Sequence, residues 1–402
     1  MTKKLLASVM AFALCQFMLA TDMIVKQKNG EIKKFNVEDV EEVIFEGSTI
    51  PVEDSTIVDE SETPLKFKIL SDSTVEVIND DSYRDALIDT IPIPSKVRID
   101  GKVYDVTAIG EGAFRSCSGL TSIKIPSSVT TIEYAAFSWC SGLTSIEIPN
   151  SVTAIGQYAF GGCSGLTSIK IPESVTAIKD STFSDCSGLT SIEIPNSVTS
   201  IGDKTFYGCS SLASINIPEN VTSIGWYAFK GCSGLASINI PEGVTYIGYS
   251  AFSGCSSLTS ISIPESVKSI VAGAFDGCSS LEPRLLVYDN GTKCYGWIGS
   301  EEECTSVVIP DGVKEIGDYA FYKIFYGLTS VTFPESLESI GEMAFAGCDK
   351  LTTAELSSNL KTLGYGAFMY CKKLDLIINA SEADINVGEN AISDCKSVTW
   401  LK

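Results

Sequence analysis

A repeat of 23 residues constrains the fold of this sequence more than any other feature. Phenylalanine recurs at that spacing from Phe114 to Phe275, and a cysteine follows each of these phenylalanines by three residues. Proline keeps the same spacing from Pro126 to Pro264. A regular period of this length predicts a solenoid, in which each repeat is one coil that buries its apolar side chains only against neighbouring coils.

Each repeat reads as a short strand followed by a compact turn. In residues 120–126, the pattern L-x-x-I-x-I-P points Leu120, Ile123 and Ile125 inward, and Pro126 ends the strand. The alanine or threonine before each phenylalanine fits a tight helical turn. We therefore predict an α/β repeat solenoid of 23-residue units, with a parallel β-sheet on one face and short helical turns opposite.

The array is expected to span residues 105–402. Residues 281–303 match the repeat poorly, but Phe275 and Phe321 are two repeat lengths apart, so this segment is expected to be one degenerate coil. A strand-rich N-terminal cap is expected over residues 65–104, and a C-terminal cap over about 380–402. Caps cover the open ends of such arrays.

Three segments precede the array. Residues 1–20 join two lysines to a short apolar run that ends in small residues, which is typical of a secretory signal peptide. Residues 21–47 alternate apolar and polar residues around Asn29-Gly30 and predict a β-hairpin-like segment. Residues 48–64 are acidic, lack Lys and Arg, and predict a linker. We expect no transmembrane span in the mature chain.

Charge and the absence of histidine exclude several function classes. The chain has 50 Asp and Glu against 29 Lys and Arg, a net charge of −21, so nucleic acid is not an expected partner. Without histidine, Ser-His-Asp catalysis and histidine-ligated zinc are excluded. A hydrolase would depend on carboxylates such as Glu301 and Glu302, whose spacing does not support catalysis. We expect no enzyme, no cofactor and no metal.

Strand and turn together form one longer motif, L-x-x-I-x-I-P followed by V-x-x-I-G-x-x-A-F-x-x-C, which recurs from about Val97 to Lys402. Glu133, Lys179 and Val271 depart from it by replacing the glycine after isoleucine. The motif resembles the BspA-like leucine-rich repeats of bacterial surface proteins. This resemblance implies a secreted or surface-held adhesion scaffold that binds host matrix proteins such as fibronectin or fibrinogen, host cells or other bacteria.

Eleven of the fourteen cysteines occupy one position of the repeat. Each would face only its equivalents in neighbouring coils, so we predict a column of small buried thiols in place of disulfides. Cys294 and Cys304 lie outside this column, and a disulfide between them is left open. No C-x-x-C pair indicates a metal site.

Two groups of residues are candidate ligand-binding surfaces. Four aromatic residues gather in two adjacent repeats and are hot-spot candidates, unless they only pack over the surface: Trp226, Tyr227, Tyr246 and Tyr249. A polar ladder occupies the exposed position of successive strands: Lys124, Glu147, Lys170, Glu193, Asn216 and Asn239. We favour a structural role for this ladder; as a binding surface it would suit multivalent contact with a fibrous protein or glycan.

Two functions from different classes remain. The first is a non-enzymatic adhesion or protein-binding scaffold, secreted or on the bacterial cell surface. The alternative is a structural or glycan-binding component of the cell envelope. Fold alone does not decide between them.

Overall fold

The computed structural model describes residues 22–26, 32–36, 57–80, 90–271, 273–288, 291–298, 304–322 and 327–401. The chain divides into two units, Met1–Glu53 and Asp54–Lys402. In the first unit, β1 (Asp22–Lys26) pairs antiparallel with β2 (Ile32–Asn36). The predicted signal peptide, the Asn29-Gly30 turn and residues 48–56 of the predicted linker lie outside the described residues.

The second unit begins with a mixed sheet at the predicted N-terminal cap. Its elements are β3 (Ile57–Asp59), the 3₁₀ helix η2 (Glu60–Glu62), β4 (Lys66–Ile69), β5 (Thr74–Ile78), β7 (Lys96–Ile99) and β8 (Lys102–Ile109). β4 and β5 form an antiparallel pair, and β5 runs parallel to β8. Arg98 on β7 donates to both carboxylate oxygens of Asp59, at 3.1 and 3.2 Å. This sheet continues from β8 into the repeat array.

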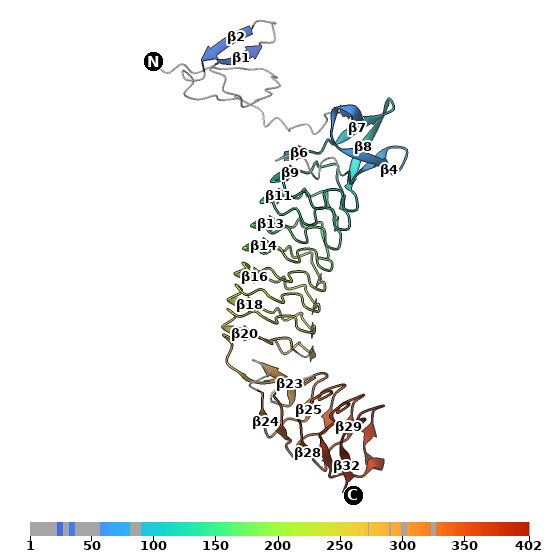
Figure 1. Cartoon of the computed structure of the whole chain (residues 1–402), viewed down its shortest axis with the longest axis vertical. Helices are drawn as coiled ribbons and strands as arrows, with labels where there is room; N and C mark the ends of the chain where they lie inside the picture. Colours follow the sequence, from blue (N-terminus) through green and yellow to red (C-terminus); the bar gives the residue numbers. More distant parts are fainter. Residues whose placement is uncertain are drawn as a thin grey trace. The chain divides into compact units, whose positions relative to one another are not determined.

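Each coil contributes a first strand, and these strands stack in sequence order along one side of the array (Figure 1). They are β6 (Thr90–Pro92), β9 (Ser122–Lys124), β11 (Ser145–Glu147), β13 (Ser168–Lys170), β14 (Ser191–Glu193), β16 (Ser214–Asn216), β18 (Ser237–Asn239), β20 (Ser260–Ser262), β24 (Ser306–Val308), β26 (Ser330–Thr332), β28 (Thr353–Leu356), β30 (Asp375–Ile378) and β32 (Ser397–Trp400). Paired first strands are parallel and lie one repeat apart. β6 already belongs to this series, within the segment predicted as the cap.

A shorter second strand follows in most coils. These strands are β10 (Thr131–Ile132), β12 (Ala154–Ile155), β15 (Ser200–Ile201), β17 (Ser223–Ile224), β19 (Tyr246–Ile247), β21 (Ser269–Ile270), β25 (Glu315–Ile316), β27 (Ser339–Ile340), β29 (Thr362–Leu363) and β31 (Asn386–Val387). They also pair in parallel from coil to coil. The unit is therefore a parallel β-solenoid built of leucine-rich repeats, as the repeat predicts.

The phenylalanine-bearing side of each coil consists of consecutive turns, and the prediction of short helical turns is wrong. In the coil of Phe137, Ala135 and Trp139 have positive φ values of 52° and 64°, which interrupt a right-handed helix. The N–H of Ser138 bonds to Ala135 within the coil, whereas the N–H of Phe137 bonds to Ala159 in the next coil at 2.8 Å. Hydrogen bonds between coils take the place of helical ones. We call this side the turn side.

The segment predicted as a degenerate coil contains an antiparallel hairpin. β22 (Arg284–Tyr288) pairs with β23 (Lys293–Ile298), and β23 then pairs in parallel with β25. Gly296 has a φ of 118°, and a β-carbon there would lie 2.0 Å from the carbonyl oxygen of Ala320. Only glycine fits this close approach.

Side chains of this hairpin reach two separate hydrophobic cores. Leu286, Tyr295 and Ile298 pack with the core of the coils before the hairpin, whereas Cys294 packs with the core of the coils after it. The Tyr295 hydroxyl also donates a buried 2.7 Å hydrogen bond to the carbonyl oxygen of Val267. The hairpin thus forms a partition between two stretches of repeats.

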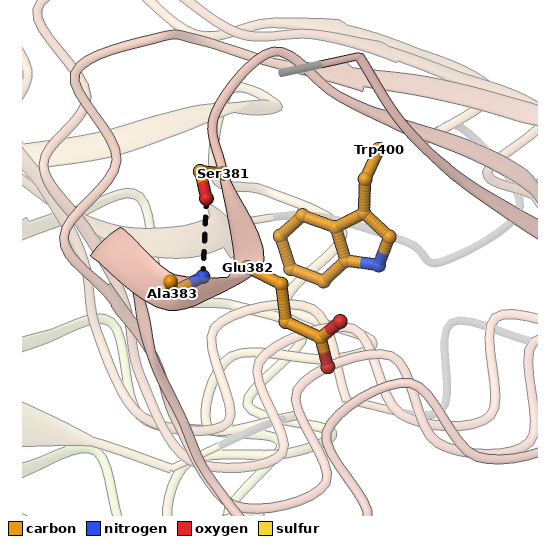
Figure 2. Close-up of a pocket in the computed structure, with 4 residues that line it drawn as sticks. All are labelled: Ser381, Glu382, Ala383 and Trp400. Atoms are coloured by element: carbon orange, nitrogen blue, oxygen red, sulfur yellow. Dashed lines mark hydrogen bonds between the residues drawn. The ribbon is translucent and has the colours of Figure 1, made fainter.

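The last coils lie in the segment predicted as the C-terminal cap. The 3₁₀ helix η4 (Glu382–Asp384) follows β30, which pairs in parallel with β32. An open depression is lined by Ser381, Glu382, Ala383 and Trp400, with the indole of Trp400 beside the Glu382 side chain (Figure 2). No helix in the described ranges is long and apolar enough to cross a membrane.

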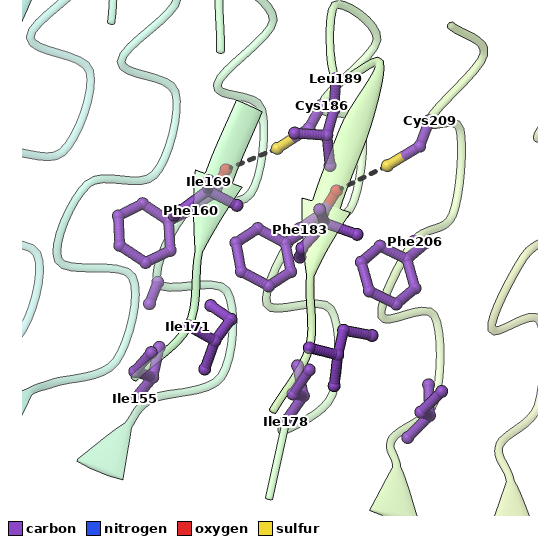
Figure 3. Close-up of a cluster of buried hydrophobic side chains, with 14 of the residues drawn as sticks. Ile155, Phe160, Ile169, Ile171, Ile178, Phe183, Cys186, Leu189, Phe206 and Cys209 are labelled. Atoms are coloured by element: carbon purple, nitrogen blue, oxygen red, sulfur yellow. Dashed lines mark hydrogen bonds between the residues drawn. The ribbon is translucent and has the colours of Figure 1, made fainter. Parts of the chain in front are cut away.

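The core of the array is a set of columns in which equivalent side chains stack on one another. Neighbouring phenylalanine rings are nearly parallel, with centroids 5.6 Å apart for Phe160 and Phe183 and 5.7 Å apart for Phe183 and Phe206 (Figure 3). The cysteines of the column beside them are not in disulfides, and all are buried except Cys395, which is partly exposed. The predicted thiol column is therefore confirmed.

Candidate functional site

The coils differ in the side chain three residues before the repeat phenylalanine. Where this residue is aspartate, its carboxylate accepts a hydrogen bond from the backbone of the equivalent residue in the next coil. Asp180 accepts from the N–H of Asp203 at 2.9 Å, and Asp203 accepts from the N–H of Trp226 at 2.7 Å. Trp226 has no carboxylate to continue this series, and it places an indole on the turn side instead.

The indole of Trp226 is fixed by a residue of the next coil. Trp226 follows β17 closely and is 51% exposed, and its Nε1–H donates a 2.7 Å hydrogen bond to the hydroxyl oxygen of Tyr246. The parallel pairing of β17 with β19 places Ser223 opposite Tyr246, which brings the two rings within reach of each other. A ring held in this way loses less conformational freedom when a ligand binds.

Tyr227 and Tyr249 form a second pair. Their ring centroids are 5.2 Å apart at an interplanar angle of 86°, a favourable edge-to-face arrangement. The Nζ atoms of Lys204 and Lys230 lie 5.7 and 5.1 Å from the centroid of Tyr227, within cation–π distance. Burial, with smaller effects of the phenols of Tyr249 and Tyr207, raises the pKa of Tyr227, so its hydroxyl stays neutral.

The structure therefore brings the four aromatic residues together as two contacting pairs, which we call the aromatic cluster: Trp226, Tyr227, Tyr246 and Tyr249. Tryptophan and tyrosine concentrate binding energy where they are rigid and accessible. The two lysines place positive charge on a chain of net charge −21. The cluster suits a partner that presents an apolar group beside a carboxylate.

Sequence analysis missed both lysines. Lys204 lies two residues before its repeat phenylalanine and Lys230 lies one residue after its own, so only the register between neighbouring coils places them on one ring. It also missed five exposed aromatic residues of the turn side: Tyr134, Trp139, Tyr158, Tyr365 and Tyr370. Tyr134 and Tyr365 occupy the same repeat position as Trp226, so the comparison of repeats that identified Trp226 could also have identified them.

The predicted polar ladder lies on the exposed side of the first strands. Strand register places Lys124 opposite Glu147, Lys170 opposite Glu193 and Asn216 opposite Asn239. Lys170 and Glu193 approach to 3.2 Å, but both are exposed, so the pair adds little stability. Threonine hydroxyls beside the ladder donate to backbone carbonyls of the preceding coil. We interpret this side as a surface that serves coil stacking.

Cys294 and Cys304, for which a disulfide was left open, are buried in the structure and are not joined by a disulfide. Cys294 pairs opposite Ile316, so it takes the place of a core isoleucine. Cys304 precedes β24 as Leu328 precedes β26, so it takes the place of a core leucine. Packing in two different core columns explains both residues without a disulfide. Burial raises the pKa of the Cys294 thiol to about 11, so it is protonated at neutral pH.

Among the residues that the structure describes, no cluster of three or more potential ligands could hold a metal ion. The depression at Trp400 has one carboxylate, Glu382, among its lining residues and no second acid or base. Glu301 and Glu302 lie outside the described residues.

Comparison with protein families agrees with the repeat. The family model of the BspA type leucine-rich repeat region matches six copies, over residues 76–213, 176–287 and 299–401. The resemblance stated from the sequence is thus confirmed. A search of the curated proteins found no match.

Two solved structures are similar over most of their length. A leucine-rich repeat protein from Bacteroides ovatus is 26% identical, with a TM-score of 0.53, and the match covers 84% of this chain and 98% of that one. A leucine-rich cell surface protein from Faecalibacterium prausnitzii is 27% identical, with a TM-score of 0.50, and the match covers 82% and 96%. Both comparisons support the solenoid fold.

Proposed function

Because the chain belongs to the BspA-type leucine-rich repeat family, we propose that it is a non-enzymatic protein-binding scaffold, secreted or held at the bacterial cell surface. A solenoid of stacked coils offers a long, rigid surface for such binding. The similar protein from Faecalibacterium prausnitzii is a cell surface protein, which supports the proposed location. Fold alone does not define a ligand, so the proposal depends on the aromatic cluster.

The observation that carries the proposal is the hydrogen bond that fixes the exposed indole of Trp226 to Tyr246. A fixed, half-exposed tryptophan is the kind of anchor that dominates protein–protein interfaces. The ammonium groups of Lys204 and Lys230, over the ring of the adjacent Tyr227, favour a protein segment with an acidic side chain. We propose host matrix proteins of the fibronectin or fibrinogen kind, or proteins of other cells, as partners.

Binding of the full chain to immobilised fibronectin, fibrinogen, collagen and bacterial envelope glycans tests this proposal. We expect saturable binding to a matrix protein that weakens as ionic strength rises, since two lysines contribute. Trp226→Ala should lower the affinity about tenfold or more. The matched control is Tyr365→Ala, which removes an exposed ring at the same repeat position in another coil.

Two results would contradict the proposal. If Trp226→Ala and Tyr365→Ala weaken binding equally, the aromatic cluster is not the site. If the chain binds only polysaccharide of the producing cell and no protein, the alternative of a structural or glycan-binding envelope component is favoured.

A further inference from the structure

A second group of aromatic rings lies on the turn side, in the coils of Phe137 and Phe160. Tyr134, Trp139 and Tyr158 are 43%, 54% and 38% exposed. The rings of Tyr134 and Tyr158 meet edge to face, with centroids 5.9 Å apart and an interplanar angle of 71°. We call these three residues the second aromatic surface. Their two coils lie four and three coils before the coil of Trp226, so they form a separate surface.

The backbone of Trp139 is unusual for a bulky residue. Its φ is 64°, in the left-handed region that disfavours any residue with a β-carbon. Most other coils have glycine with a positive φ at this position: Gly162, Gly208, Gly231, Gly254, Gly277 and Gly347. Because the indole of Trp139 is half exposed, the free energy gained by its burial offsets only part of the cost of this backbone conformation.

Two consecutive glycines in the coil of Phe160 leave space for two of these rings. A β-carbon on Gly162 would lie 2.6 Å from two ring atoms of Trp139, and one on Gly161 would lie 3.3 Å from the Tyr158 ring. Both glycines are buried. Consecutive glycines therefore let the two rings lie close against the backbone. The result is a low, rigid surface of aromatic rings, in which side chains of the supporting backbone do not intervene.

The polar residues around these rings differ from those around Tyr227. Arg115, Glu133 and Gln157 are exposed at adjoining positions, and Gln157 donates a 3.1 Å hydrogen bond to Asp180. These side chains supply both donors and acceptors. Among the residues that the structure describes, no lysine lies over these rings as Lys204 and Lys230 lie over Tyr227. The chain carries a net charge of −21, which repels anionic polymers.

We propose that the second aromatic surface binds a neutral glycan. The polarised C–H groups on one side of a pyranose ring stack on the electron-rich face of an aromatic ring. Hydroxyl groups at the edge of the sugar meet the mixed donors and acceptors of Arg115, Glu133 and Gln157. Successive coils rise by about 4.8 Å, so an extended chain of sugars contacts rings of both coils at once, and weak contacts add together. This inference does not depend on the protein-binding function proposed above.

Titration of the full chain with neutral hexasaccharides, namely cellohexaose, mannohexaose and N-acetylchitohexaose, tests the proposal by calorimetry and tryptophan fluorescence. Sialyllactose and heparin oligosaccharide serve as anionic probes. We expect saturable binding of at least one neutral probe, and a loss of about tenfold or more in Trp139→Gly. Because glycine is the common residue at this position, Trp139→Gly should melt at the same or a higher temperature than the parent chain.

Tyr370→Gly is the matched control. Tyr370 has the same φ of 64°, the same repeat position and 51% exposure in a distant coil. The Tyr370→Gly variant should relieve the same backbone strain and leave the affinity for the glycan unchanged. The proposal is overturned if no neutral probe binds, if only anionic probes or peptides bind, or if Tyr370→Gly weakens glycan binding as much as Trp139→Gly.

Discussion

The Sγ of Cys186 donates a 3.1 Å hydrogen bond to the carbonyl oxygen of Phe160 in the preceding coil (Figure 3). The same carbonyl accepts the backbone N–H of Cys163 at 3.1 Å. The thiol therefore occupies the second acceptor site of a buried carbonyl. Equivalent bonds recur along the column, as between Cys209 and Phe183. Hydrogen bonding, in addition to small volume, explains cysteine at this repeat position.

Cys186→Ala tests this role. Loss of the donor leaves a buried carbonyl with one partner fewer and a small void, so the free energy of unfolding should fall by about 2 kcal/mol. Urea denaturation followed by circular dichroism measures the loss. The control is Cys395→Ala, because Cys395 is partly exposed and its bond to Phe368 is longer, at 3.5 Å. Equal losses in the two variants would contradict the prediction.

Alkaline pH should destabilise the fold through the same thiols. Burial raises the pKa of Cys278 to about 12, from an ordinary value of 9.0. Between these values the unfolded chain has released the proton and the folded chain still holds it, so stability falls as pH rises from about 9 to about 12. One such thiol changes the free energy of unfolding by about 1.4 kcal/mol per pH unit.

Cys278→Ala should therefore give a shallower dependence of stability on pH. Urea denaturation at about pH 9.5 and about pH 10.5 gives the slope, which should decrease by roughly the contribution of one thiol. Ser279→Ala, an exposed neighbour without a thiol, serves as the control. Ser279→Ala should keep the slope of the parent chain. The prediction is refuted if Cys278→Ala keeps that slope as well.

Repeat spacing predicted the coils, the parallel strands and the thiol column, because these features depend on which residues recur and at what distance. It did not predict the conformation of the turn side. The residues around Phe137 are compatible with a helix by composition, and only the positive φ values of Ala135 and Trp139 exclude one. Those values arise from hydrogen bonds to the next coil, which no single repeat contains.

Repeat spacing was also insufficient to predict the hairpin and the arrangement of the aromatic cluster. Residues 281–303 have the length of one coil, so spacing could not distinguish a coil from the hairpin of β22 and β23. The aromatic residues of the cluster were visible because they depart from the repeat. The positions of Lys204 and Lys230 over Tyr227 depend on the register between coils and on side-chain conformation, which the sequence does not state.

Gly296→Ala should disrupt the partition between the two cores. A β-carbon at Gly296 would lie 2.0 Å from the carbonyl oxygen of Ala320, at a φ of 118°. Backbone must then move, so we expect a loss of about 3 kcal/mol or more. Gly291→Ala is the control, because Gly291 has a φ of 83° and nothing within 4 Å of its built β-carbon. That change should cost about 1 kcal/mol. If thermal unfolding shows an equal loss of stability in the two variants, the close approach of Gly296 to the Ala320 carbonyl is contradicted.

Tyr246→Phe tests whether the indole of Trp226 is fixed before any ligand binds. The change removes the hydroxyl that accepts the indole N–H and keeps the ring, so the fold should remain intact. In the ¹⁵N-labelled chain, the indole N–H resonance of Trp226 should shift and exchange faster with water. The chain has four tryptophans, so the spectrum of Trp226→Phe identifies the resonance.

The same variant separates fixed orientation from simple contact area. Releasing one side chain that must be ordered again on binding costs about 0.5–1.5 kcal/mol, so affinity for the matrix ligand should fall about two- to tenfold. Tyr249→Phe is the control, because it keeps the edge-to-face contact with Tyr227 and does not touch the indole hydrogen bond. If Tyr246→Phe leaves both the resonance and the affinity unchanged, the hydrogen bond does not orient Trp226 in solution, and the aromatic cluster binds only through the area of its rings.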